Sequence, residues 1–336
     1  MARFPLRSKR EAIGHSVMTN YAMNLTSSVE SKAATGFSPV PFAMRRRFFL
    51  LAMALPAVAY VIALGVFPLV KGMWYSLYEY NLLKPARTHF VGIDNYINLL
   101  ADADFRGAIA NTVIFTVFSV TIELAFGFVI ALALWRDDRF NRVCLTLILV
   151  PVTITPLVVG LIFKGLLLAD YGMVGYYLAQ WGITDPRGLF ATPSTALATL
   201  IFIDVWEWTP LVALILLAGL KALPGDLLEA AAVDGATAWR TFRSITLPLM
   251  LPAVMLALTL RTIDAFRVFD SVFVTTGGGP GNSTNTLMVY AVKEGLSFFN
   301  IGKASAISNI ALLCVAIIAT CFILMIRHFD KKANGR

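Results

Sequence analysis

Charged side chains stand inside long apolar stretches of this sequence, where they cost free energy unless they are paired or hydrated. The stretch 251–275 carries Arg261, Asp264, Arg267 and Asp270. An Arg or Asp in the middle of a membrane helix costs roughly 2.5–3.5 kcal/mol. Because these residues are spaced three apart, opposite charges can pair along one helix. Two interpretations remain open: ion pairs that join two subunits, or a polar lining that hydrogen-bonds the hydroxyl groups of a solute.

A second stretch, 195–220, combines carboxylates with aromatic rings. Asp204 and Glu207 lie three residues apart around Trp206, and Pro210 follows. This combination suits carbohydrate recognition, and it equally suits a helix kink. Two further charges, Glu123 and Lys164, could form a buried pair, although their spacing does not indicate one. The candidate path residues are Asp204, Trp206, Glu207, Asp264, Phe266, Arg267 and Asp270.

The composition indicates that lipid surrounds most of the chain. Of the 336 residues, 58% are hydrophobic and 14% are charged, and the mean hydropathy is +0.73. Such values are typical of a polytopic membrane protein, in which unpaired backbone groups force the spans to be helices. We predict an all-α integral membrane protein with six transmembrane helices, at 48–70, 108–135, 143–168, 195–220, 251–275 and 304–326. The first apolar run is too long and starts too late for a cleaved signal, so we expect it to be retained.

The distribution of Lys and Arg predicts the orientation. With the N-terminus inside, eighteen of these residues fall in cytoplasmic segments and seven in outside segments. The positive-inside rule therefore predicts that both termini are cytoplasmic. This asymmetry accounts for most of the net charge of +8, and the dispersed basic residues do not indicate a nucleic-acid surface.

Several chemistries find no support in the sequence. The cysteines (Cys144, Cys314 and Cys321) and the histidines (His15, His89 and His328) are scattered without metal-ligand or disulfide spacing. The chain lacks the G-x-x-x-x-G-K-[ST] pattern of a P-loop, and we interpret the run Gly277 to Gly281 as an outside turn. We therefore predict no metal, no catalytic residue and no cofactor in this chain.

We divide the chain into four parts. Residues 1–47 form a polar cytoplasmic tail that we expect to be disordered, and 48–107 hold the first helix and an outside loop with a short interfacial helix after Phe90 to Tyr96. Residues 108–326 form a five-helix core that includes a cytoplasmic loop, 221–250, and 327–336 form a cytoplasmic tail. Pro151, Pro156 and Gly160 interrupt the third expected helix.

The cytoplasmic loop predicts a helix, a sharp turn and a second helix. Asp226 precedes Glu229 by three residues, as in a capping box, so a short helix should start at Leu227. Gly235 can adopt positive φ and should end that helix. A second helix over 239–246 follows, and Pro248 should restart the chain for the fifth span.

The same loop resembles the EAA loop of permease subunits in binding-protein-dependent ABC importers. The resemblance rests on Glu229-Ala-Ala, then Gly235, then Ile245-x-Leu247-Pro248. It is closest to the first permease of carbohydrate-uptake systems, through Phe90-Val-Gly-Ile-Asp-Asn-Tyr96, Leu217-Ala-Gly-Leu-x-x-Leu-Pro224 and Thr275-Thr-Gly-Gly-Gly-Pro280. It implies the type I importer permease fold over residues 48–326. The coupling residues that it implies are Glu229, Ala230, Ala231, Asp234, Gly235, Ile245, Leu247 and Pro248.

The resemblance also implies an assembly. The chain would be one permease subunit in a bacterial inner membrane, beside a second related permease and a dimer of ABC ATPases that bind ATP and Mg²⁺. An extracytoplasmic solute-binding protein would deliver a sugar or a sugar-like solute. The alternative is an ion-coupled secondary transporter, which usually shows repeated halves that this sequence lacks. An intramembrane enzyme is a third class, but Asp264 and Asp270 are interleaved with arginines and make a poor catalytic pair.

Overall fold

The computed structural model describes residues 42–333, so most of the expected N-terminal tail lies outside the described residues. Contacts separate the described residues into two units, 42–67 and 68–333. The first contains α2 (Phe42–Val61) and the π-helical turn η1 (Ile62–Val66), an apolar run that includes Pro56. Its apolar side chains are exposed, as expected for a helix that meets lipid or another subunit.

The second unit consists of helices and one small hairpin. A two-stranded antiparallel sheet pairs β1 (Tyr78–Glu79) with β2 (His89–Phe90). Its longer helices are α3 (Phe67–Tyr75), α4 (Asp94–Ala101), α5 (Ala103–Ala133), α6 (Arg139–Ile148), α7 (Pro156–Leu167), α8 (Met173–Gln180), α9 (Pro193–Lys221), α13 (Leu251–Phe266) and α16 (Ile301–Ala333). Shorter elements are η2 (Pro85–Arg87), η3 (Pro151–Thr153), α10 (Gly225–Val233), α11 (Ala238–Thr241), η4 (Phe242–Thr246), α12 (Leu247–Leu249), α14 (Asp270–Thr275), α15 (Leu287–Val292) and η5 (Lys293–Ser297).

Four helical segments of the described chain are long and apolar enough to cross a membrane: Ala52–Tyr75, Ala103–Ala133, Pro193–Lys221 and Ile301–His328. A fifth span results if Ala238–Leu249 and Leu251–Thr275 are counted together across their 63° bend. The predicted helical membrane class is confirmed, whereas the count of six is not. The last helix also continues through Ala333 rather than ending before residue 327.

The third expected span is divided into two short helices. α6 ends at Ile148, the 3₁₀ turn η3 follows, and α7 restarts with Pro156 in its first turn. Pro151 and Pro156 cannot donate backbone hydrogen bonds, which explains the interruption. Gly160 does not interrupt the helix: it lies inside α7, where a Cβ would stand 2.6 Å from a methyl group of Val274 on α14. Its small size therefore serves close helix packing.

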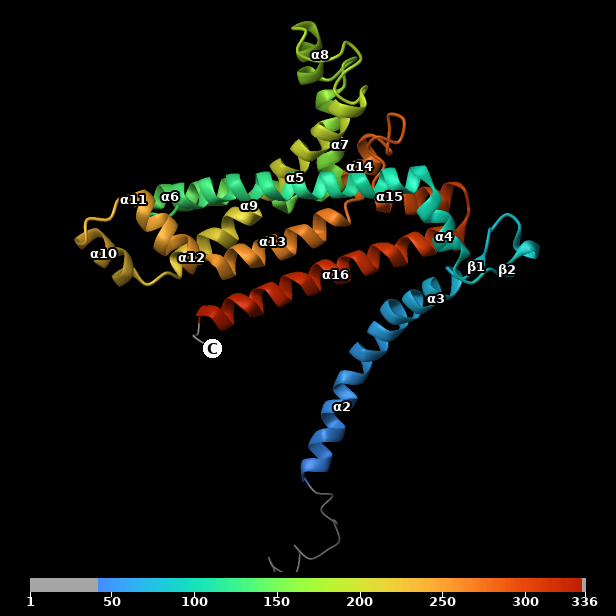
Figure 1. Ribbon diagram of the computed structural model, residues 1–336, viewed down its shortest axis with the longest axis horizontal. Helices are drawn as coiled ribbons and strands as arrows, with labels where there is room; N and C mark the ends of the chain where they lie inside the picture. The colour runs from blue at the N-terminus through green and yellow to red at the C-terminus, as the bar shows by residue number, and fades with distance from the viewer. Residues whose placement is uncertain (1–41, 334–336) are drawn as a thin grey trace, which may run out of the picture. The chain divides into compact units, whose positions relative to one another are not determined.

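The long helices α5 and α9 form the main pair of the bundle, and α13 and α16 lie beside them (Figure 1). A Cβ at Gly127 of α5 would approach Val212 of α9 to 2.7 Å and the backbone nitrogen of Ala213 to 3.2 Å. The two backbones can therefore approach closely only because residue 127 has no side chain. In Figure 1, α10 and α11 lie at one end of this bundle, and α4 and the hairpin lie at the other.

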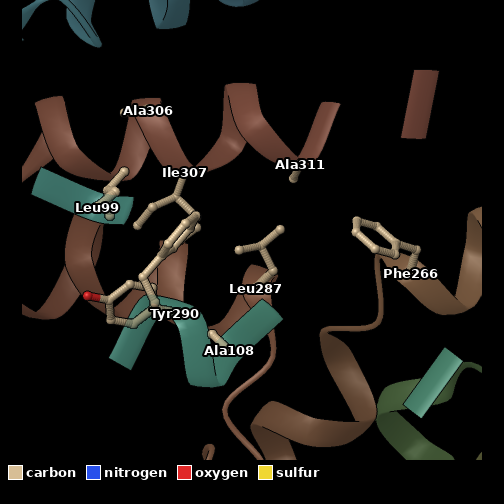
Figure 2. Close-up of a cluster of buried hydrophobic side chains, with 10 residues drawn as sticks. Leu99, Ala108, Phe266, Leu287, Tyr290, Ala306, Ile307 and Ala311 are labelled. Atoms are coloured by element: carbon tan, nitrogen blue, oxygen red, sulfur yellow. The ribbon is translucent and has the colours of Figure 1, made fainter. Parts of the chain in front are cut away.

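An apolar cluster closes the end of the bundle near α4. Leu99 of α4, Leu287 and Tyr290 of α15, and Ile307 of α16 are buried against one another (Figure 2). The predicted interfacial helix after Tyr96 is present as part of α4. Tyr290 turns its hydroxyl group away from the cluster, toward polar partners.

We expect Gly127→Ala to destabilise the protein by about 1–3 kcal/mol, because the added methyl group overpacks the contact between α5 and α9. The measurement is the thermal unfolding midpoint in detergent. Gly107→Ala is the matched control on the same helix, since nothing lies within 4 Å of its Cβ position. It should be neutral or stabilising, because Ala favours helix over Gly. Equal effects of both changes would contradict the packing argument.

Candidate functional site

Arg261 of α13 is the centre of a buried ion-pair network. Its Nε donates to Oε2 of Glu123 at 2.6 Å, and its Nη2 donates to Oε1 of Glu123 at 2.7 Å and to Oδ2 of Asp204 at 2.9 Å. Its Nη1 donates to Oδ2 of Asp264 at 2.7 Å. The arginine is 1% exposed, and its guanidinium carbon lies 4.9 Å from the ring centre of Trp208. One cation therefore binds three carboxylates and an aromatic face.

This network joins three spans, because Glu123 belongs to α5, Asp204 to α9 and Arg261 to α13. The bidentate contact with Glu123 uses the fork geometry that distinguishes arginine from lysine. The pairing of Arg261 with Asp264 along one helix agrees with the spacing of three. The contact between Glu123 and Lys164 does not occur: the Lys164 ammonium group instead donates to the carbonyl of Val274 at 3.0 Å.

A small polar pocket of about 90 Å³ lies beside the network, where α13 ends and α14 begins. The break between these helices falls at Arg267 to Phe269. Asp264 is 49% exposed on its side chain, and Arg267 lies 4.0 Å from it. The pocket is lined by Pro156, Asp204, Trp208, Asp264, Ala265, Arg267, Val268, Phe269, Asp270 and Ser271. A polyhydroxylated molecule would find carboxylate acceptors, a guanidinium donor and two aromatic rings here.

The structure thus brings four of the seven predicted path residues to one pocket: Asp204, Asp264, Arg267 and Asp270. The other three lie elsewhere. Trp206 packs edge-on against Phe163 and lines a separate apolar groove, and Phe266 is buried in the apolar cluster of Figure 2.

Glu207 is the third of these residues, and it is 1% exposed. Its Oε1 atom has no hydrogen-bond partner among the described residues. Sequence reasoning missed Trp208 as a pocket residue. Its position next to Glu207 in an apolar stretch was the available signal, because that position places it one turn from Asp204 on α9.

A second polar cluster lies at the N-terminal ends of α5 and α16. The ammonium group of Lys303 donates to Asp102 at 2.9 Å, to Glu294 at 2.8 Å and to the hydroxyl of Tyr290 at 2.8 Å. Asp102 also caps α5 by accepting from the backbone N–H of Asp104. Burial opposes its ionisation, but hydrogen bonds from Lys303, Tyr290 and Asp104 hold the pKa of Asp102 below its ordinary value of 3.8.

A helical elbow, residues 225–249, projects from the opposite end of the bundle (Figure 1). Its first helix, α10, ends in a Schellman motif: Gly235 has φ +70°, its N–H donates to Ala232, and the N–H of Ala236 donates to Ala231. The predicted helix end at Gly235 is confirmed. Ala231 is buried, whereas Glu229, Ala230 and Asp234 are exposed.

Two details of the predicted elbow are wrong. α10 begins at Gly225 after Pro224, without a side-chain cap, so Asp226 lies in the first turn instead of capping the helix. A carboxylate there still interacts favourably with the helix dipole. Pro248 does not start the fifth span, because it lies within α12, and the long helix α13 begins at Leu251 with Pro252 in its first turn.

The elbow exposes apolar surface. Val233 is 88% exposed and Trp239 is 69% exposed, and each is followed by a charged residue, Asp234 or Arg240. A groove of about 370 Å³ runs between α10 and the following helix, lined by Leu227, Ala230, Ala231, Asp234, Ala236, Arg240, Thr241, Ser244 and Ile245. Ile245 thus faces the groove, while Leu247 and Pro248 follow it on α12. Exposed apolar groups with a polar rim are typical of a protein interface.

In residues 42–333, no group of three or more His, Cys, Asp or Glu is placed to hold a metal ion. The sequence matches the family model of the inner membrane component of binding-protein-dependent transport systems over residues 123–335. The chain belongs to this family. The match covers α9, the elbow and α13, and so includes both the pocket and the helices that position it.

Curated relatives agree with this membership, and a solved structure shares the fold. The chain is 39% identical to a probable ABC transporter permease protein, y4oQ, of Sinorhizobium fredii, over 79% of this chain and 85% of the relative. It is 36% identical to the trehalose transport system permease protein SugA of Mycobacterium tuberculosis, over 92% of this chain and 97% of the relative. A bacterial ABC transporter involved in alginate import superposes with a TM-score of 0.73 at 20% identity, covering 85% of this chain and 97% of that one. These relatives are transport subunits, so this inner membrane component is not an enzyme.

We expect Arg261→Met to destabilise the protein by about 3–5 kcal/mol, because Glu123 and Asp204 would remain buried without a cation. The readout is the unfolding midpoint and the fraction of monodisperse protein after extraction in detergent. Arg267→Met is the matched control on the same chain segment, since its side chain is largely exposed. A midpoint that falls equally in both variants would contradict the network's structural role.

Asp102 predicts an acid-dependent loss of stability. Because its folded pKa lies below the ordinary value, its contribution is complete at neutral pH and is lost as the pH falls through the folded pKa, below about 3.8. Asp102→Asn should therefore lower the unfolding midpoint at pH 7, and the difference from the wild type should shrink at pH 3. Asp94→Asn, an exposed carboxylate on α4, is the control and should show no such pH dependence. A difference that stays constant with pH would contradict the linkage.

Proposed function

We propose that this inner membrane component is one of two permease subunits in an ATP-driven importer of a carbohydrate or a related polar solute. It forms half of the translocation path. Its partners are a second related permease, a dimer of ABC ATPases and an extracytoplasmic solute-binding protein. ATP and Mg²⁺ bind to the ATPases. The membership in a binding-protein-dependent family supports this assignment over an ion-coupled secondary transporter.

The observation that carries the coupling role is the exposed elbow. α10 presents Glu229 and Ala230 on an exposed surface, and the apolar side chains of Val233 and Trp239 project nearby. A short helix stopped by Gly235 offers a rigid surface that fits a cleft in another protein. In the proposed complex this partner is the ATPase, with Glu229 paired to one of its basic residues and Ala230 permitting close approach.

The elbow is connected to the pocket through a single bend in the chain. α12 ends at Leu249, the chain bends by 63°, and α13 runs from Leu251 to Phe266, next to the pocket. A displacement of the elbow would move α13, and Arg261 would carry α5 and α9 with it. Closure of the ATPase dimer on ATP would thereby turn the path from inward facing to outward facing. ATP drives this change because it binds the closed dimer more tightly than the open one.

The polar pocket supports a polyhydroxylated cargo. Asp204, Asp264 and Asp270 offer acceptors to hydroxyl groups, Arg267 offers donors, and Trp208 and Phe269 offer apolar faces. The relatives named above include a permease of a trehalose transport system. By the positive-inside rule we place both termini, and the elbow, on the cytoplasmic side.

We expect Gly235→Val to lower solute uptake by more than tenfold while membrane insertion stays intact, because Val is strained at φ +70° and the elbow would deform. Gly225→Val is the matched control: both glycines have open space around the Cβ position, but only Gly235 has positive φ. Uptake of labelled solute into cells and the amount of assembled complex are measured together.

Glu229→Lys reverses the charge that is proposed to pair with the ATPase. It should uncouple ATP hydrolysis from uptake and lower solute uptake about as much as Gly235→Val does. Stimulation of ATPase activity by loaded binding protein, in nanodiscs, measures the coupling directly. Normal uptake in both Glu229→Lys and Gly235→Val would overturn the assignment of the elbow.

A further inference from the structure

We infer that the path through this subunit selects by charge: it admits neutral or cationic polyhydroxylated solutes and excludes anionic ones. The inference rests on the proposed function, because only a translocation path requires solute to pass this pocket. It deepens that function by naming the class of cargo.

Carboxylates dominate the walls of the pocket. Asp204, Asp264 and Asp270 line it, and Arg267 is the cation among its lining residues. Arg267 approaches Asp264 only to 4.0 Å and also donates to the carbonyl of Ile263 at 3.3 Å. The Arg267 side chain is 57% exposed and that of Asp264 is 49% exposed, so water screens both charges, and Asp270 is exposed as well. One loosely held guanidinium therefore faces three carboxylates.

The buried arginine behind the pocket does not remove this imbalance. Arg261 divides one positive charge among Glu123, Asp204 and Asp264, with all contacts at 2.6–2.9 Å. Lys164 on α7 does not line the pocket, and its ammonium group donates to the carbonyl of Val274. The pocket wall and the arginine behind it therefore hold three carboxylates, Asp204, Asp264 and Asp270, against two guanidinium groups, Arg261 and Arg267.

Burial makes this imbalance effective. Asp204 is 5% exposed, so its field acts through protein rather than through water, and the single charge of Arg261 that offsets it is shared with Glu123 and Asp264. A negative group on a solute would meet this field inside a pocket that offers one partly screened guanidinium. A hydroxyl group meets acceptors without any Coulombic penalty, and an amino group would gain an ion pair. The geometry therefore disfavours carboxylated, phosphorylated or sulfonated solutes.

The test measures the electrostatic potential in the pocket directly. In the full-length chain, assembled in its complex in nanodiscs, Cys144, Cys314 and Cys321 are replaced by Ser, and Val268→Cys places a thiol on the pocket wall. The thiol is modified by a cationic methanethiosulfonate (trimethylammonioethyl) and, separately, by an anionic one (sulfonatoethyl). Each rate is divided by the rate of the same reagent with free 2-mercaptoethanol, and the two normalised rates are compared. The neutral methyl reagent establishes access, with and without ATP.

We expect the normalised ratio of cationic to anionic rates to be at least tenfold at residue 268. The double change Asp264→Asn and Asp270→Asn should lower the ratio at least threefold. A thiol at Ser297, on the exposed turn η5, is the control position and should give a ratio near one. Asp264→Ser with Asp270→Ser, which also removes both charges, checks that the change follows charge rather than side-chain shape.

Each outcome decides the inference. A ratio near one at residue 268, or a ratio that does not respond to loss of the two aspartates, overturns it. If no reagent reaches residue 268 or a second wall position, Phe269→Cys, in either nucleotide state, the pocket is not on the path and the inference also fails. The ratio does not require transport. Uptake that is intact with a ratio of one therefore overturns only the charge selection. A high ratio in a chain that recruits no ATPase overturns the proposed function, and with it the selection of cargo, and leaves only the negative potential of the pocket.

Discussion

Arg261 imposes the strictest physical constraint on this bundle, because a guanidinium group that is 1% exposed must keep its three carboxylate partners. Moving two charges from water into the protein interior costs roughly several kcal/mol of free energy per ion. Only ion pairs and hydrogen bonds of near-ideal geometry offset that cost. α5, α9 and α13 must therefore hold their relative positions at this level. The close approach at Gly127 has the same consequence further along α5 and α9. Together these contacts define a rigid three-helix centre.

The elements around this centre are less constrained. α13 stops at Phe266, and the irregular segment before α14 leaves Asp264, Arg267 and Asp270 around a pocket rather than in an ion-pair ladder. Irregular backbone at membrane depth is tolerated where it lines a polar cavity. The polar pocket thus accounts for the break in the helix, because it can satisfy the backbone groups that the break leaves unpaired. In a continuous α13, oppositely charged residues three apart, such as Arg267 and Asp270, could have paired along its surface.

The two ends of the bundle differ in how they satisfy their polar groups. At one end, Lys303 joins Asp102, Glu294 and Tyr290 in a closed cluster above the apolar core of Figure 2. At the other end, the elbow leaves Val233 and Trp239 exposed, together with the carboxylates of α10. The first arrangement is complete within the chain, whereas the second is typical of a surface that another protein covers. This asymmetry agrees with the proposal that a partner protein docks on the elbow.

The sequence by itself determined the helical membrane class, the limits of α9 and α16 to within a few residues at most ends, and the turn at Gly235, since these depend on local hydrophobicity and on one residue's conformational freedom. It also indicated that Arg261 and Asp264 can pair, because that contact spans one helical turn. Only the tertiary structure decided that Glu123 binds Arg261 rather than pairing with Lys164, that Phe266 is buried, and that Trp208 lines the pocket. Those contacts join residues far apart in the chain, and their geometry follows from how α5, α9 and α13 pack, which no local pattern encodes.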